Sequence, residues 1–231
     1  MLIILSYIEK MKGTLITFEG GEGAGKTTQI QRLIPWLKSY TNERVTILST
    51  REPGGTILGK QIRELLLNPQ FEEIQDLTEL LLYAADRSQH VEEYLKPHLE
   101  TGAIVICDRY CDSTIAYQGY GRGFDLNLIQ QLNYIATGGL ESDLTLWLDV
   151  DVETGLKRVN TRGERDHTVP GQNLDRLEKT KLSFHKRVRE GFLAIASSYP
   201  QRVATINANK SENEVFKEIQ NIVKAKVFMD Y

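Results

Sequence analysis

Four glycines and a lysine lie close together in the run Gly20, Gly21, Glu22, Gly23, Ala24, Gly25, Lys26, Thr27 and Thr28. The apolar run 15–18 precedes them and predicts a buried strand, and apolar residues at helical spacing follow in 30–37. The pattern Gly-x-x-x-x-Gly-Lys-Thr between a strand and a helix is typical of a loop that binds phosphate with its backbone N–H groups. The alternative is a glycine-rich turn with a chance lysine, which the flanking pattern disfavours.

Two oxygen-bearing side chains near this loop predict a magnesium position. Lys26 would reach the β and γ phosphates of a nucleotide, and the Thr27 hydroxyl would hold Mg²⁺. Asp108 ends the apolar run 103–107, so its carboxylate is a second candidate ligand. Arg109 would offset charge on a transferring phosphoryl group, although a surface ion pair between Asp108 and Arg109 is the alternative.

Further candidate residues follow the second predicted strand and lie in the long helix after it. Arg51 stands beside a Pro-Gly-Gly turn, where it could bind phosphate or pair with Glu52 on the surface. Tyr83 and Arg87 are four residues apart and share one helix face. A ring and a guanidinium suit a nucleobase, but a core tyrosine with an arginine that reaches to solvent is an equally simple interpretation.

Two other segments carry polar side chains. The polar and aromatic stretch 113–119 includes Ser113, Tyr117 and Gln118 and could line the pocket of a second substrate. The stretch 163–175 is bracketed by arginines, which favours a loop that closes over phosphates or, alternatively, charged and solvated helix ends. These arginines are Arg158, Arg162, Arg165 and Arg176.

Apolar runs alternate with helical patterns along the chain. Strands are expected at 15–18, 45–48, 103–107, 144–148 and 203–206, with helices at 26–38, 58–67, 77–99, 126–135 and 184–199 and after Ser211. Ser211 to Glu214 form a capping box, Gly138 and Gly139 suit a helix end, and Pro35 predicts a kink. Continuous apolar strands between helices predict a parallel sheet covered on both faces, with ligands at the carboxyl ends of the strands.

Composition sets broad limits on the function. The 231 residues are 41% apolar and 26% charged, as in a globular protein of one or two domains. A net charge of −3 gives no general attraction to nucleic acid or to an anionic membrane, and no stretch is long enough to span a bilayer. Cys107 and Cys111 are expected to be buried thiols, which fits a reducing cytoplasm. Residues 1–12 are expected to be a non-essential extension that makes a poor signal peptide.

The order and spacing of these motifs resemble the thymidylate kinases of the bacterial kind. The resemblance spans residues 11–223, and its matching pieces are 18–29, 50–56, 82–87, 108–110, 116–119 and 175–178. It implies an α/β P-loop nucleoside monophosphate kinase fold, a five-stranded parallel sheet with helices on both faces and a mobile lid at about 160–178. Residues 13–231 would form the single domain.

The resemblance also implies an activity. The enzyme would use ATP and Mg²⁺ to phosphorylate dTMP to dTDP in dTTP synthesis, as a cytoplasmic homodimer without nucleic acid or membrane partners. The helix at 126–135 is a candidate interface. Alternatives are another nucleoside monophosphate kinase of the UMP/CMP type, a non-catalytic nucleotide sensor or a GTPase switch. A GTPase would need Asn-Lys-x-Asp, whereas the nearest string, at 209–212, ends in glutamate.

Residue roles follow from the resemblance position by position. Tyr83 would stack on thymine, where most relatives have phenylalanine, and Arg87 would meet a thymine carbonyl. Arg51 and Arg109 would hold the dTMP phosphate, Tyr117 would crowd the 2′ position of the sugar, and Ser113 and Gln118 would line the pocket. Glu22 would reach the sugar of the acceptor, and the segment 206–209 would lie against adenine. Catalytic roles are implied for Lys26, Arg109, Glu22 and one lid arginine.

The lid departs from the family pattern. In relatives, Arg-Gly and about two residues lead straight into Asp-Arg-x-Glu, but here residues 165–174 are inserted between the two pieces. The sequence therefore leaves the catalytic lid arginine open among Arg162, Arg165 and Arg176.

Overall fold

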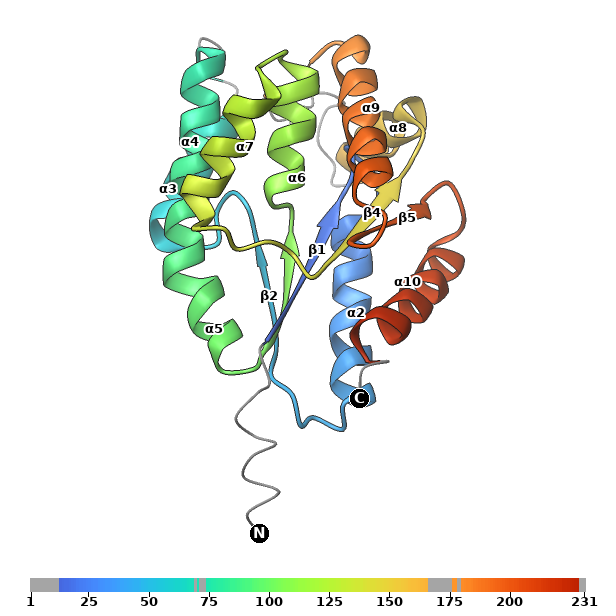
Figure 1. Cartoon of the computed structure of the whole chain (residues 1–231). Helices are drawn as coiled ribbons and strands as arrows, with labels where there is room; N and C mark the ends of the chain where they lie inside the picture. The colour runs from blue at the N-terminus through green and yellow to red at the C-terminus, as the bar shows by residue number, and fades with distance from the viewer. Residues whose placement is uncertain (1–12, 69, 71–73, 166–175, 178–179, 229–231) are drawn as a thin grey trace.

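Five parallel strands form one sheet in the order β2-β3-β1-β4-β5. The strands are β1 (Thr14–Glu19), β2 (Ile47–Arg51), β3 (Ile104–Asp108), β4 (Leu144–Asp149) and β5 (Val203–Asn207). All neighbouring strands pair in parallel, and the arrows of β1 to β4 point upward in Figure 1. This arrangement confirms the predicted parallel sheet.

The computed structural model describes residues 13–68, 70, 74–165, 176–177 and 180–228, without the side chains of 162–165. The expected extension at 1–12 and most of the expected lid lie outside the described residues.

The register of the sheet aligns the chemistry-bearing residues. Phe18 of β1 and Arg51 of β2 both pair with Asp108 of β3, so the loop after β1 and the turns after β2 and β3 leave the sheet at one level. The second strand is Ile47–Arg51 rather than the predicted 45–48. The predicted bounds were wrong because β2 is an edge strand whose later residues are polar, so the apolar pattern ends before the strand does. Pairing with β3 fixes the bounds instead.

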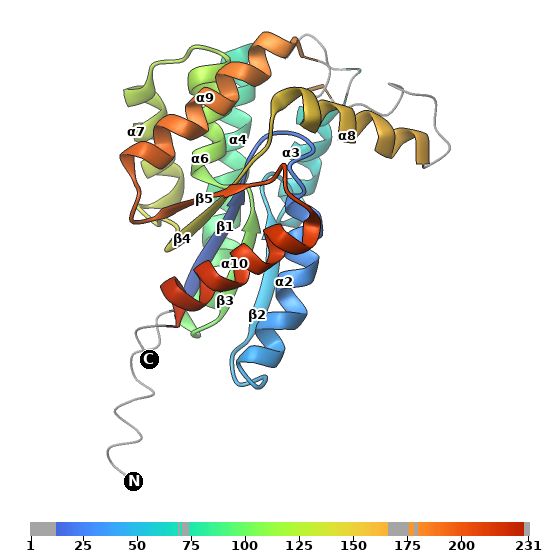
Figure 2. The same ribbon diagram turned by 90° about the vertical axis from the view of Figure 1, so that its right-hand side faces the viewer.

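Helices cover both faces of the sheet, as predicted (Figure 2). On one face, α2 (Lys26–Tyr40) and α10 (Glu212–Val227) pack against a core that includes Phe18, Leu33 and Ile219. Helix α2 runs through Pro35, and the capping box of Ser211 and Glu214 is present at the start of α10.

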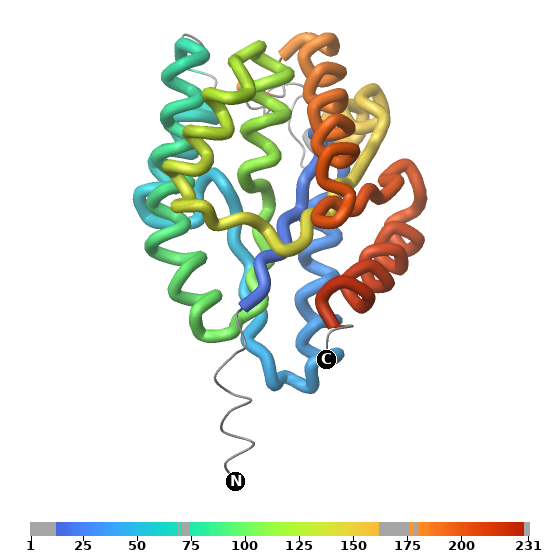
Figure 3. Tube along the Cα trace, viewed as in Figure 1, coloured from blue at the N-terminus to red at the C-terminus, as the bar shows by residue number. Residues whose placement is uncertain are grey.

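The other face is covered by more segments. They are the π-helix η2 (Val91–Leu95), α5 (Lys96–Glu100), α6 (Cys111–Thr114), the π-helix η3 (Ile115–Gly121) and α9 (Leu182–Ser198). Helix α4 (Asp76–His90) continues through η2 into α5 as one rod (Figure 3), which the sequence predicted as a long, interrupted helix. Helices α3 (Ile57–Leu67) and α7 (Leu126–Thr137) flank α4, and α7 ends at Gly138 in the left-handed region.

Two helical segments were not predicted. Helix α8 (Val152–Arg165) has a strongly polar surface, so its apolar stripe is short, and α6 with η3 is rich in polar and aromatic residues. Across the described ranges, no helix combines the length and apolar character needed to cross a membrane.

Helix α8 approaches the loop after β1 without side chains between them. A Cβ on Gly155 would lie 2.3 Å from the carbonyl oxygen of Glu22, and one on Gly23 would lie 2.1 Å from the carbonyl oxygen of Gly155. Both glycines are therefore required by a backbone-to-backbone contact.

We expect Gly155→Ala to lower the free energy of unfolding by about 1–3 kcal/mol, because overpacking must push two backbones apart. Chemical denaturation of the nucleotide-free protein measures this. Gly21→Ala is the matched control, since its Cβ would meet nothing within 4 Å. Equal stabilities of the two variants would contradict the contact.

Candidate active site

The loop after β1 is shaped by glycines that take positive φ angles. Gly20, Gly23 and Gly25 have φ of 139°, 68° and 91°, and Gly25 is the N-cap of α2. The Nζ atom of Lys26 lies over this loop and donates to the carbonyl oxygens of Gly20 at 3.0 Å and Gly21 at 3.1 Å. Burial and the nearby Arg109 guanidinium lower the pKa of Lys26. The loop thus combines a helix N-terminus with a held lysine, as a phosphate site requires.

Arg109 connects this loop to a second pocket. Its Nη1 donates to the carbonyl of Gly20 at 3.1 Å, its Nη2 donates to Oε1 of Glu22 at 2.6 Å, and its guanidinium lies 4.8 Å from the ring centroid of Tyr117. Burial alone would raise the pKa of Glu22, but Arg109 and Lys26 bring that pKa to about 2. The alternative of a surface pair between Asp108 and Arg109 is wrong, because Arg109 pairs with Glu22.

Asp108 has an unusual unpartnered oxygen. Its Oδ1 atom is buried and has no hydrogen-bond partner among the described residues. Asp108, Thr27 and Arg51 line one cavity at the carboxyl ends of β2 and β3. A buried carboxylate oxygen without a donor, with a hydroxyl lining the same cavity, fits the oxygen ligands that Mg²⁺ prefers. The donor set is thus compatible with the predicted magnesium position.

A second cavity collects most of the predicted acceptor residues. Its lining residues include Glu22, Tyr83, Arg87, Arg109, Ser113, Tyr117 and Gln118. Arg51 is not among them and lines the cavity of Thr27 and Asp108 instead. Glu22 lies in the loop after β1, Arg109 contacts that loop, and both line this second cavity, called the acceptor pocket below. The loop and the pocket therefore adjoin at this ion pair.

Arg87 is held by a buried network. Its Nε donates to Glu52 at 2.8 Å, its Nη1 to Thr114 and Asn133, and its Nη2 to the carbonyl of Tyr110. With 2% of its surface exposed, Arg87 does not reach to solvent, so that alternative for the Tyr83 and Arg87 pair is wrong. Four of its five N–H groups have protein acceptors, and the fifth, on Nη2, has none among the described residues.

Glu52 pairs with residues other than Arg51, which one of the two sequence alternatives gave as its partner. Its two carboxylate oxygens accept from Arg87 and from Nδ1 of His90, at 2.8 Å each. The Nε2 atom of His90 lies 2.7 Å from the hydroxyl of Thr50. The alternative surface pair of Arg51 with Glu52 is therefore wrong. Sequence spacing cannot reveal this, because His90 is brought in from α4 by the fold.

Arg176 is engaged by residues of α3 and α4. It donates through Nε to the carbonyl of Leu66 at 2.9 Å and through Nη2 to the buried carboxylate of Glu79. Glu79 also accepts from Gln118 at 2.9 Å and from Arg122. Burial would raise the pKa of Glu79, but these donors lower it. The side chains of Arg162 and Arg165 lie outside the described part of the chain.

Arg63 was not singled out by the sequence, and Arg158 was named only as one of the arginines that bracket the stretch 163–175. Arg158 donates to the carbonyls of Gly23 at 3.4 Å and Ala208 at 3.0 Å, so it joins the phosphate-binding loop to the segment 206–209. Arg63 lines the acceptor pocket and donates to the carbonyl of Pro53 at 3.0 Å. Neither lies in a recognisable motif, so only the folded chain brings them to the site.

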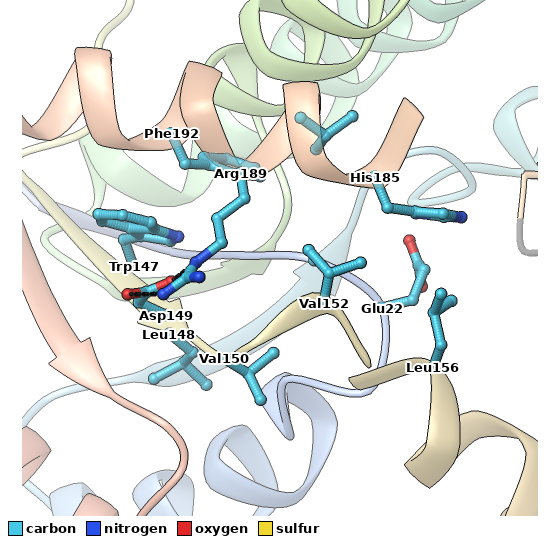
Figure 4. Close-up of a pocket in the computed structure, with 12 residues that line it drawn as sticks. Glu22, Trp147, Leu148, Asp149, Val150, Val152, Leu156, His185, Arg189 and Phe192 are labelled. Carbon is cyan, nitrogen blue, oxygen red and sulfur yellow. Dashed lines mark hydrogen bonds and ion pairs between the residues drawn. The ribbon is translucent and has the colours of Figure 1, made fainter. Parts of the chain in front are cut away.

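A third cavity lies beside the phosphate-binding loop, between β4, α8 and α9 (Figure 4). Figure 4 shows Glu22 and His185 at one side and the ion pair of Asp149 with Arg189 at the other. That pair is bidentate, with distances of 2.7 and 3.0 Å, and the walls between the two ends are mainly apolar. The cavity therefore lies between Glu22 and α9 and offers few polar groups that would bind a nucleotide.

Comparison with known proteins agrees with this geometry. The family model described as thymidylate kinase matches residues 18–219. The chain belongs to the thymidylate kinase family. It is 52% identical over 232 residues to the thymidylate kinase of Cyanothece sp., covering 96% of this chain and 97% of the relative. It is 53% identical over 215 residues to the thymidylate kinase of Nostoc punctiforme, covering 93% and 97%.

A solved structure of the family has the same fold. The thymidylate kinase from Ehrlichia chaffeensis superposes with a TM-score of 0.72 at 37% identity, covering 91% of this chain and 98% of that chain. The predicted resemblance and fold are thus confirmed. The roles of individual site residues stay predictions.

We expect Arg176→Ala to lower the free energy of unfolding by about 2 kcal/mol, because the buried Glu79 carboxylate loses a charged donor while keeping Arg122 and Gln118. Denaturant unfolding at neutral pH measures the change. Arg44→Ala, at an exposed position before β2, is the control and should stay within about 0.5 kcal/mol of the parent. A stability unchanged in Arg176→Ala would show that the buried pair does not hold this segment.

Proposed function

We propose that this chain transfers the γ-phosphoryl group of ATP to the 5′-phosphate of dTMP, in the cytoplasm and with Mg²⁺. The observation that carries the proposal is the position of Arg109. Its guanidinium touches the phosphate-binding loop at Gly20 and also lines the acceptor pocket, where a donor and an acceptor phosphate would meet. Family membership supplies the reaction class, and the two free cysteines suit a reducing compartment.

The donor side uses the loop after β1. Its N–H groups and the start of α2 would bind the ATP phosphates, with Lys26 at the β and γ positions. Thr27 and Asp108 would hold Mg²⁺, and Arg51 lines the same cavity. The ion, when bound, supplies positive charge at the phosphate oxygens. Arg158, which bridges Gly23 and Ala208, places a guanidinium beside the segment proposed to meet adenine.

The acceptor side has a shape and polarity suited to a nucleotide with a carbonyl-bearing base. Tyr83 and Arg87 both line the pocket. We propose that the remaining N–H group of Arg87 meets the base, and arginine can only donate. It would therefore favour the carbonyl of thymine over the amino group of cytosine at the same position. Tyr117 is held by its hydroxyl, which donates to Glu22 at 2.7 Å, and its ring would restrict the sugar.

The reaction needs little acid or base chemistry. The acceptor oxygen belongs to a phosphate that is already anionic at neutral pH, so no strong base has to remove a proton. The obstacle is the repulsion between two polyanions, which Lys26, Arg109 and a lid arginine would offset as charge builds up on the transferring group. Since Arg176 is engaged with Glu79, Arg162 and Arg165 are the better candidates for that lid arginine.

We expect Lys26→Ala and Arg109→Ala each to lower kcat by about 100-fold or more, because each removes a cation next to the transferring phosphoryl group. A coupled assay of ADP release with dTMP measures turnover. Arg44→Ala should leave turnover unchanged. Near-wild-type rates in either purified variant would contradict these roles.

The same assay tests the acceptor. ADP release should be faster with dTMP than with UMP, CMP or AMP at equal concentration. Faster turnover with UMP or CMP would point to the other kinase type, and ATP binding without acceptor-dependent turnover would point to a sensor.

We further propose that the chain forms a homodimer through α3, α4 and α7. These helices lie side by side in Figure 1, and α4 packs against both of the others. They expose nine large apolar side chains, namely Ile57, Leu58, Leu65, Leu77, Leu81, Leu126, Leu128, Tyr134 and Ile135. An apolar surface of this extent on neighbouring helices is typical of an interface. A second copy of the chain is the occupant that fits the predicted interface at 126–135.

Ile135→Glu is expected to convert the dimer into a monomer, because it places a charge on a surface that the partner would bury. Ile135 is 74% exposed in the single chain, so the change should not unfold it. Light scattering after size-exclusion chromatography measures the mass. Leu193→Glu, at a 58% exposed position on α9, is the control and should remain dimeric. A monomeric parent, or a dimeric Ile135→Glu, would reject this interface.

A further inference from the structure

Glu19, the last residue of β1, is a buried acid directly before the phosphate-binding loop. None of its surface is exposed, and it lies outside the residues assigned above to nucleotide binding. Burial and the neighbouring Asp112 carboxylate raise the pKa of Glu19 to about 7. A buried carboxylate with a raised pKa opposes stability when it is ionised, so its presence here needs a reason other than stability.

The partners of Glu19 all come from one turn. Its Oε1 accepts from the backbone N–H of Tyr110 at 2.7 Å and from that of Ser113 at 3.3 Å. Its Oε2 accepts from the hydroxyl of Ser113 at 2.6 Å. These donors follow β3 directly, because Tyr110 is the N-cap of α6 and Ser113 lies within that short helix. The carboxylate thus ties the end of β1 to the segment that carries Arg109.

Arg109 needs such support because its backbone is unfavourable. Its φ is 71°, in the left-handed region that side chains other than glycine rarely adopt. Its backbone N–H donates to the carbonyl of Phe18 at 2.9 Å, and the next residue, Tyr110, is the one that Glu19 holds. Glu19 and β1 therefore fix the backbone on both sides of the strained residue.

Ser113 links Glu19 to the guanidinium of Arg109. Its hydroxyl donates to Glu19 and accepts from Nη1 of Arg109 at 3.1 Å. When the Glu19 carboxylate is ionised it can only accept, so it then sets the direction of this hydroxyl. An amide at position 19 would keep the size of the side chain but would place a donor opposite that hydroxyl.

We propose that Glu19 is a positioning residue for phosphoryl transfer, which acts through Tyr110 and Ser113 to hold Arg109 between the two nucleotides. The inference rests on the proposed function. If the guanidinium beside the transferring phosphoryl group is displaced by about 1 Å, the reaction can slow by up to about 100-fold. The hydrogen bonds of Glu19 go to Tyr110 and Ser113 and not to Lys26, so we expect nucleotide binding through the loop N–H groups and Lys26 to change much less than turnover.

The first test is Glu19→Gln. We expect kcat for dTMP phosphorylation to fall about tenfold or more, while KM for ATP stays within about twofold, because only the Arg109 side is disturbed. Thr17→Val is the matched control. Thr17 lies two residues earlier on the same face of β1, is fully buried and bonds to Thr145 at 2.8 Å. It reaches Asp112 of α6 only through Thr145 and does not bond to Tyr110 or Ser113, the two residues that Glu19 holds. Its turnover should stay within about twofold of the parent, even if its stability falls.

The second test places Glu19→Gln in an Arg109→Ala background. If Glu19 acts through Arg109, the substitution should change the residual rate less than twofold there. An equal fold-loss in both backgrounds, or a turnover of Glu19→Gln like that of the parent, would overturn the proposal. Failure of the proposed function itself is distinguishable, since the parent enzyme would then release no ADP with dTMP.

Discussion

Lys26 and Arg109 meet at a single carbonyl oxygen, that of Gly20, at 3.0 and 3.1 Å. Two cations held this close repel each other, and the arrangement persists because Glu22 pairs with Arg109 and lies near Lys26. The parallel sheet makes this possible. Its register brings the end of β1, which leads into the loop, level with the end of β3, which leads into Arg109. The positions of both cations in the candidate site therefore depend on one backbone atom, the carbonyl oxygen of Gly20.

The acceptor pocket is built on a second buried charge cluster. Glu52 accepts from Arg87 and His90, and Arg87 reaches three further acceptors. Buried ion pairs of this kind contribute little net stability when they replace well-packed apolar groups. They do hold side chains in one orientation, as the proposed recognition of a base in this pocket would need. Arg87 is thus held in place by its hydrogen bonds, and Arg109 is held by Glu22 and the carbonyl of Gly20. Both guanidinium groups are fixed before any ligand binds.

Local patterns in the sequence predicted most of the fold and the core of the site. The loop at 20–28, the sheet and the capping box at Ser211 were predictable because each depends on neighbouring residues. The edge strand β2 and the polar helix α8 were not, since pairing and packing decide them. The sequence was least able to predict which charged residues form ion pairs. Adjacent residues suggested Arg51 with Glu52 and Asp108 with Arg109, whereas the fold pairs Glu52 with Arg87 and Arg109 with Glu22. Glu79 and Arg176 are 97 positions apart, which no local pattern can connect.

The contact between Gly23 and Gly155 has a mechanical consequence. Side chains can change rotamer and absorb a small displacement, but here backbone meets backbone, and even one methyl group does not fit. The first turns of α8 and the phosphate-binding loop are therefore expected to move as one unit. Any tilt of that helix would be passed directly to the loop, and nucleotide phosphates in the loop would in turn restrain the helix.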